Sequence, residues 1–239
     1  MTDKGNRLAN LSLPLSIDTF IDPNLNGRSY DAHILGARVI FVTGGNTGIE
    51  YETVKQLLLK NAKVYLAARS GNKASAAIER LKEETHKTAI FVQLDLADLA
   101  SLPALAKSCE ETKVSARVIN TSSIGHQMLA PGQGIEFVSL EGGPERDAQL
   151  YGQSKMGNVL VSKYLAETYS DVLVSCSLHP GSIQTELGRM GAYTQLWGAT
   201  VATAAQINGQ YLVPWCKIGQ ADKRATNTEL QEEVITYLK

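Results

Sequence analysis

Residues 37–61 read ARVIFVTGGNTGIEYETVKQLLLKN, and this stretch decides the fold. It opens with a short, largely β-branched apolar run, which is typical of a buried strand. Glycines follow at positions 44, 45 and 48, and from Tyr51 onward the apolar residues recur at helical spacing. The stretch therefore predicts a strand, a glycine-rich turn and a helix.

The same alternation of strand and helix continues along the chain. Further apolar strands are expected at residues 63–68, 89–95, 116–123, 172–178 and 210–215, with helices at 73–85, 97–111, 149–169 and 194–205. Continuous apolar strands separated by amphipathic helices indicate a parallel sheet that is covered on both faces. The predicted fold class is therefore α/β, a doubly wound parallel sheet of the Rossmann type.

Length and composition favour one domain without a nucleic-acid or membrane partner. A chain of 239 residues that is 44% hydrophobic can bury one sizeable core. Residues 1–36 have only brief apolar patches and are expected to form an N-terminal arm, leaving residues 37–239 as a single domain. The net charge of -1 offers no electrostatic footprint for nucleic acid or an anionic membrane, so a small-molecule substrate is expected.

Cysteine usage and hydropathy indicate a soluble, cytoplasmic protein without a metal site. The three cysteines, Cys109, Cys176 and Cys216, are widely spaced and suggest neither a disulfide framework nor a zinc site. No stretch approaches the roughly 18 consecutive apolar residues of a membrane span, and the N-terminus lacks the pattern of a signal peptide.

The turn at residues 43–50, TGGNTGIE, is predicted to bind the phosphates of a dinucleotide. Glycines let the backbone approach a pyrophosphate, and the N-terminus of the following helix offers N–H donors and the positive end of its dipole. The alternative is a purely structural turn, because any connection from a strand to a helix can require glycine.

Glu50 places a carboxylate in this turn. Its spacing from Thr47 matches a capping box, with Thr47 as the N-cap residue and Glu50 reaching back from the third helical position. A carboxylate in the first turn also suits the helix dipole. The same carboxylate would repel a pyrophosphate, so we expect Glu50 to stabilise the helix at the expense of nucleotide affinity.

The end of the second strand indicates which nucleotide is preferred. A site for NAD usually has an acidic residue here for the ribose hydroxyls, whereas this strand ends Ala67-Ala68-Arg69-Ser70. Arg69 can pair with a 2′-phosphate, which favours NADP. The alternative for Arg69 is a solvated loop residue.

Three segments in the second half point to one redox chemistry: Ser122-Ser123 at the end of a strand, Tyr151 to Lys155 (YGQSK) on a helix, and the turn at 179–185 (HPGSIQT). Tyr151 and Lys155 are four residues apart and share a helix face. A tyrosine is a poor base at neutral pH, but a neighbouring ammonium favours its phenolate. Tyr151 can then exchange a proton with a substrate oxygen while hydride moves to or from a nicotinamide. Ser123 can hold the carbonyl by a hydrogen bond.

In this combination the chain resembles the short-chain dehydrogenase/reductase superfamily, within it the fungal members of the retinol-dehydrogenase-like and WW-domain-oxidoreductase-like branch. The resemblance covers residues 37–239 and is strongest at 51–70, 119–126 (INTSSIGH), 142–148 (GGPERDA), 151–155 and 177–187 (SLHPGSIQTEL). It implies that Ser123 orients the substrate, that Tyr151 donates or accepts the proton, and that Lys155 supports Tyr151 and binds the nicotinamide ribose.

The resemblance also implies a cofactor site for NADP. Asp95 would lie at the adenine ring, although a helix N-cap is an equal alternative for this residue. His126 and His179 are interpreted as loop residues with structural roles, and a homo-oligomer is implied through the helix of the YxxxK pair. The implied cofactor-binding residues are Gly44, Asn46, Thr47, Gly48, Ile49, Arg69, Asp95, Tyr151, Lys155, Ile183 and Thr185.

The chain departs from the family pattern at two places. Glu50 replaces the third glycine of the TGxxxGxG fingerprint, and the NNAG motif is missing. The interval from Asp95 to Ser123 has room for one helix only, since a βαβ unit takes about thirty residues. One central strand-helix unit is therefore predicted to be absent, through a real deletion or misplaced exon boundaries. The first and fifth strands of the family would then pair directly or leave unpaired edges in the middle of the sheet.

Two functions follow from these observations. The first is an NADP(H)-dependent oxidoreductase that interconverts an apolar alcohol and a carbonyl compound, with Tyr151 as the proton donor. The second is a catalytically impaired member of the family that serves as a pseudoenzyme or nucleotide-binding module. Ser123, Tyr151 and Lys155 favour the enzyme, whereas Glu50 and the missing motif favour the pseudoenzyme.

Overall fold

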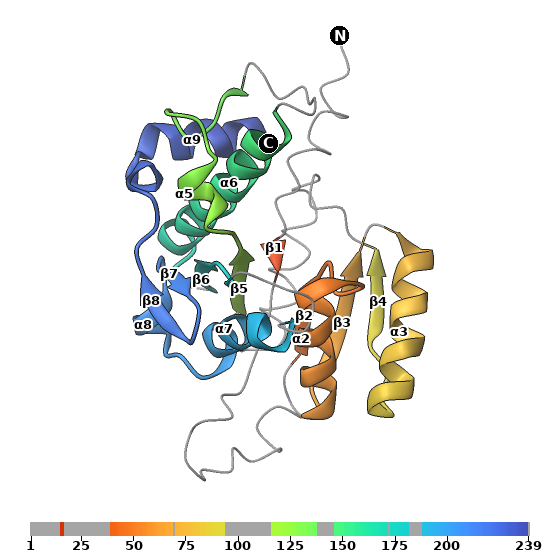
Figure 1. Cartoon of the computed structure of the whole chain (residues 1–239). Helices are drawn as coiled ribbons and strands as arrows, with labels where there is room; N and C mark the ends of the chain where they lie inside the picture. The colour runs from red at the N-terminus through yellow and green to blue at the C-terminus, as the bar shows by residue number, and fades with distance from the viewer. Residues whose placement is uncertain are drawn as a thin grey trace.

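The computed structural model describes residues 15–16, 39–68, 70–93, 116–137, 146–171, 173–181 and 188–238. All six strands predicted from the sequence are present, and the α/β class is confirmed. The strands do not form one sheet, however. They divide into a three-stranded and a five-stranded sheet, which lie side by side in Figure 1.

The first sheet carries the phosphate loop. Its order is β2 (Val39–Thr43), β3 (Lys63–Ala68) and β4 (Ile90–Gln93), all parallel. The helices α2 (Gly48–Leu59) and α3 (Gly71–Thr85) pack on it. A core of aliphatic residues joins the strands to both helices, among them Val42, Val54, Leu57, Leu66 and Leu81.

The second sheet carries the predicted redox residues. Its order is β1 (Leu15–Ser16), β5 (Ala116–Thr121), β6 (Leu173–Leu178), β7 (Tyr211–Val213) and β8 (Lys217–Gly219). The three central strands are parallel, and β1 and β8 are antiparallel to their neighbours.

Alternating residues of β5 enter two different cores, because successive side chains of a strand point to opposite faces. Val118 packs with α6 (Asp147–Thr168) and α9 (Thr228–Leu238). Ile119 lies in the core beneath α7 (Gly188–Thr200) and α8 (Ala204–Ile207). The five-stranded sheet is therefore covered on both faces, as its apolar strands predict.

Among the described strands, β2 and β5 lie at the facing edges of two different sheets. The sequence leaves two outcomes open, direct pairing of these strands or unpaired edges between them, and the structure shows no pairing between the two described strands. Instead Leu15 and Ser16 of the N-terminal arm pair with Asn120 and Ile119 of β5. Figure 1 shows β1 between β5 and β2, with contacts to both. These two residues thus supply hydrogen-bond partners to part of the β5 edge that faces β2.

The helix α7 joins the two sheets through side chains. Ala192 and Leu196 belong to the core of α2 and its strands. Between them, Gln195 accepts a hydrogen bond from the Thr53 hydroxyl of α2 at 2.9 Å. Its amide donates to the Thr121 hydroxyl at the end of β5 at 2.7 Å. Two buried hydrogen bonds therefore connect α2 of the three-stranded sheet, through Gln195, to β5 of the five-stranded sheet.

Several elements were not predicted. They are β1, α5 (Gly125–Met128), β8, the 3-10 helix η3 (Lys223–Thr226) and α9. The predicted helix at 97–111 and most of the arm lie outside the described residues. No helix in the described ranges is both long enough and apolar enough to cross a membrane.

Candidate active site

The phosphate loop leaves free space beside the backbone of its first glycine, Gly44. Gly44 has a φ of +71° and donates its N–H to the Ala67 carbonyl at 2.8 Å. A Cβ atom on Gly44 would meet nothing within 4 Å. Gly45 is different, because a Cβ atom there would lie 2.9 Å from Val54, so this glycine permits close packing of α2 on the sheet. The loop thus keeps both properties that a dinucleotide loop requires.

The predicted capping box at the start of α2 is wrong. Thr47 is the N-cap residue, as expected, but its side chain makes no capping hydrogen bond. The Glu50 carboxyl instead contacts Gln195 and Thr121 and faces the ammonium of Lys155. These partners belong to α7, β5 and α6. Tertiary contacts have therefore replaced the local capping interaction.

Glu50 is a partly buried acid that faces a partly buried base, Lys155. Burial raises the pKa of the Glu50 carboxyl, and the opposing influences are its own backbone N–H, the Lys155 charge, and the Gln195 and Thr121 side chains. Burial lowers the pKa of Lys155, while the Glu50 charge acts in the opposite direction. Each group supports the charge of the other in a site that disfavours both.

Ser122 and Ser123 differ in what their hydroxyls contact. Ser122 is buried, and its Oγ donates to the Lys155 carbonyl at 2.7 Å. Ser123 is partly exposed, and its Oγ accepts the Gly125 N–H at 3.1 Å. Within the described residues the Ser123 O–H has no acceptor, so this hydroxyl can donate to a substrate.

Tyr151 and Lys155 share a face of α6, as their spacing predicts. Tyr151 is 46% exposed, and its ring covers Gly125, where a Cβ atom would come within 2.9 Å of the ring edge. The Lys155 Nζ lies 5.6 Å from the centre of this ring and donates to the Thr121 carbonyl at 3.3 Å. Gly125 therefore brings Ser123 and Tyr151 together, with Lys155 on the inner side.

Gly152 fixes α6 against the segment that follows α5. A Cβ atom at this position would lie 2.4 Å from the Ala130 nitrogen and 2.5 Å from the Leu129 carbonyl carbon, both of which are backbone atoms. We expect Gly152→Ala to lower the free energy of unfolding by about 1–3 kcal/mol or more, since overpacking must displace the backbone. Urea denaturation measures the change. Gly132→Ala in the same segment is the control, because its Cβ atom meets nothing within 4 Å; equal stability of the two variants contradicts the close packing at Gly152.

Three further residues of the site were missed by sequence reasoning. Thr121 and Gln195 contact Glu50. Asn158 is buried, and its side-chain amide donates to the same Thr121 carbonyl as Lys155, at 2.7 Å. The spacing of Asn158 from Tyr151 and Lys155 puts it on one helix face and could have revealed it. Nothing in the local sequence marks Gln195.

The structure describes some of the remaining predicted residues and leaves others outside the described ranges. His126 lies on α5 rather than in a loop and is fully buried, whereas His179 follows β6 as expected and accepts the Gly181 N–H at 3.3 Å. No group of three metal-binding side chains occurs among the residues that the structure describes. Asn46, Thr47 and Ile49 lie in the phosphate loop and the start of α2. Arg69, Asp95, Ile183 and Thr185 lie outside the described residues.

The parallel strands and the helices that cover them define a Rossmann-type α/β fold, and comparison with known proteins gives the family. Residues 38–122 match the family model described as short chain dehydrogenase. A short-chain dehydrogenase/reductase of Armillaria gallica is 35% identical, covering 86% of this chain and 90% of its own. Retinol dehydrogenase 11 of Mus musculus is 32% identical over 68% of this chain and 67% of its own. The protein belongs to the short-chain dehydrogenase/reductase family, in its retinol-dehydrogenase-like branch.

Solved structures show the same fold. A protein of unknown function from Mycobacterium paratuberculosis superposes with a TM-score of 0.64 at 21% identity, covering 84% of this chain and 91% of its own. A short chain dehydrogenase of Escherichia coli complexed with NADPH gives a TM-score of 0.52 at 17% identity, over 76% and 98%. The alignment with the Armillaria relative spans 283 positions, more than the 239 residues of this chain. That relative therefore holds internal residues that this chain lacks, in agreement with the predicted deletion.

The loop geometry fits the diphosphate of a nicotinamide dinucleotide, with one opposing charge. Gly44 leaves open space for a close approach, and the helix α2 directs its N-terminal dipole toward the loop. Glu50 is the opposing group, because its Oε2 lies 3.4 Å from the position of a Cβ atom on Gly48. The diphosphate can approach Gly48 only if this carboxyl turns away or is neutral.

Proposed function

We propose that the protein is an NADP(H)-dependent oxidoreductase that interconverts an apolar alcohol and a carbonyl compound. The observation that supports this most directly is the arrangement around Gly125. The Tyr151 ring covers this glycine, the Ser123 hydroxyl binds its N–H, and the Lys155 ammonium lies behind the ring. Three groups with the chemistry for carbonyl reduction therefore converge at one partly exposed place.

In the proposed reaction each of these groups has a separate role. The Ser123 O–H donates a hydrogen bond to the carbonyl oxygen and holds the substrate. A nicotinamide dinucleotide, when bound at the phosphate loop, would supply the hydride for the carbonyl carbon. The Tyr151 hydroxyl transfers its proton to the oxygen, which completes the alcohol. The Lys155 ammonium stabilises the phenolate that remains, because an opposite charge nearby favours the charged form.

A direct test is reduction of an apolar aldehyde by the purified full chain. We expect NADPH absorbance to fall when a medium-chain aliphatic aldehyde is added, and to fall more slowly with NADH. Fluorescence titration of NADPH measures nucleotide binding separately from turnover. NADPH binding without turnover contradicts the enzyme and supports a nucleotide-binding module. The absence of both binding and turnover supports a pseudoenzyme. The observation that favours a pseudoenzyme is the Glu50 carboxyl beside Gly48.

Arg69 is proposed to select NADPH over NADH through the 2′-phosphate. We expect Arg69→Ala to reduce this preference by about 1.5–3 kcal/mol, the size of a hydrogen bond to a charged group. Paired titrations with NADPH and NADH measure it. Lys82→Ala, which removes a positive charge from the last turn of α3, is the control and should keep the preference. Equal affinity of the unmutated protein for both nucleotides excludes the role.

A further inference from the structure

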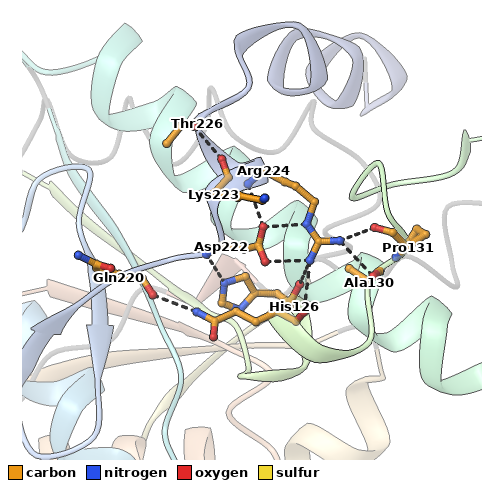
Figure 2. A network of polar contacts seen from close by, with 9 residues as sticks. His126, Ala130, Pro131, Gln220, Asp222, Lys223, Arg224 and Thr226 are labelled. Atoms are coloured by element: carbon orange, nitrogen blue, oxygen red, sulfur yellow. Dashed lines mark hydrogen bonds and ion pairs between the residues drawn. The ribbon is translucent and has the colours of Figure 1, made fainter.

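Arg224 binds the end of α5 with its whole guanidinium group. Its Nη1 donates to the carbonyls of Ala130 and Pro131, and its Nη2 donates to those of His126 and Gln127, each at 3.3 Å. Figure 2 shows the guanidinium between these carbonyls and the Asp222 carboxylate. The guanidinium thus satisfies the carbonyls of His126 and Gln127 in α5, to which no backbone N–H of the described residues donates.

Asp222 holds the guanidinium in place from the other side. Its Oδ1 accepts a hydrogen bond from Nε of Arg224 at 2.7 Å, and its Oδ2 accepts one from Nη2 at 2.8 Å, so the two side chains make a two-point contact. The hydrogen bonds from Arg224 lower the pKa of Asp222 despite its partial burial. A planar fork of this kind fixes orientation as well as charge, and a lysine cannot reproduce it.

His126 connects the same segment to Ser123. Its Nδ1 lies 2.6 Å from the Ser123 carbonyl, which can only accept, so Nδ1 carries the proton. Its Nε2 lies 3.1 Å from the Asp222 backbone nitrogen, which can only donate, so Nε2 is unprotonated. The imidazole is therefore neutral, in agreement with burial, which lowers the pKa of His126. The ring links the C-terminal segment to the backbone of Ser123.

These contacts reach the proposed reaction centre through α5. The first residue of α5, Gly125, binds the Ser123 hydroxyl and lies under the Tyr151 ring. The end of α5 contacts α6 at Gly152, next to Tyr151. A displacement of α5 would therefore move Ser123 and the support of Tyr151 together.

We infer that Arg224, together with Asp222 and His126, fixes the position of α5. In this position the hydroxyl groups of Ser123 and Tyr151 can both reach the carbonyl oxygen of the substrate. The inference rests on the proposed function for its kinetic consequence. The three residues act through α5 and do not touch the substrate. Asp222 and Arg224 come from a segment beyond the last strand predicted from the sequence, and through His126 on α5 they join that segment to the reaction centre.

The test uses the full chain with 3-fluorotyrosine at position 151, observed by ¹⁹F NMR, together with kinetics on the unlabelled protein. The variants are Arg224→Ala and Arg224→Lys. The control is Lys223→Ala, since Lys223 is the exposed neighbour on η3. If Arg224→Ala fails to fold, Asp222→Asn removes the two-point contact while keeping the side-chain size.

We expect Arg224→Ala to move the ¹⁹F resonance toward that of free fluorotyrosine and to lower kcat about 10- to 100-fold, because misplaced groups lose that much rate. The KM for NADPH and the NADPH affinity should stay unchanged. Arg224→Lys should restore the resonance and kcat only in part.

An unchanged resonance in both Arg224 variants overturns the positioning role, whatever the activity. A displaced resonance with unchanged kcat in an active enzyme overturns it as well. If the resonance moves but the unmutated protein reduces no carbonyl compound, the positioning of Tyr151 stands and the proposed function fails.

Discussion

Replacing Tyr151 with phenylalanine is expected to lower the rate of carbonyl reduction by about 10²–10⁴-fold, the usual contribution of a general acid. The substitution removes the transferable proton. It leaves the ring over Gly125, so packing and nucleotide binding should change little. Steady-state kinetics measure the loss, and NADPH fluorescence measures the affinity that should persist.

Tyr164→Phe provides the control for this experiment. Tyr164 lies on the same helix as Tyr151 and packs against the core between α6 and α9. Its loss of a hydroxyl should leave turnover intact. A Tyr151→Phe variant that keeps most of the wild-type rate excludes Tyr151 as the proton donor.

Replacing Glu50 with glutamine or glycine is expected to strengthen NADPH binding at least tenfold. At an effective dielectric constant of 20, two charges about 5 Å apart interact by about 3 kcal/mol, and Glu50 opposes a diphosphate. Glutamine keeps the side-chain size and removes the charge. Glycine also lowers helix stability by about 1 kcal/mol, so this variant should melt lower without ligand yet gain more protection from NADPH.

The pH dependence gives a second readout on the same residue. Because burial raises the pKa of Glu50, the carboxyl takes up a proton at a higher pH than an exposed acid does. NADPH affinity of the unmutated protein should therefore rise as the pH falls through this pKa, and Glu50→Gln should flatten the change. Glu79→Gln on the exposed face of α3 is the matched control. Unchanged affinity in both Glu50 variants shows that the carboxyl does not face the nucleotide.

Local sequence patterns predicted those features of the site that depend on the spacing of residues close together in the chain. Tyr151 and Lys155 share a helix face because of their spacing, and Gly44 and Gly45 retain the turn that their positions predict. The capping box failed for the opposite reason. The Glu50 partners Thr121 and Gln195 lie far along the chain, and their combined contacts outweigh one local hydrogen bond.

The C-terminal segment shows a different limitation. The spacing of Leu230, Val234 and Ile235 is typical of a helix, and all three are buried in α9. This spacing alone is sufficient to predict the helix. The carbonyls that Arg224 binds lie in a short helix without a strong pattern and in the turn that follows it, so its role could not be predicted from the local sequence.

The interrupted sheet changes which kind of bond holds the halves of this protein together. In a continuous sheet, backbone hydrogen bonds join neighbouring strands and tolerate almost any side chain. Here the side chains of Thr53, Gln195 and Thr121 supply part of that connection, beside the apolar packing of α7 on α2. Their loss would leave buried polar groups unpaired, at a cost of about 1–3 kcal/mol for each. Part of the cohesion of the fold therefore depends on a few replaceable side chains, and a single substitution can weaken the connection between the phosphate loop and the reaction centre.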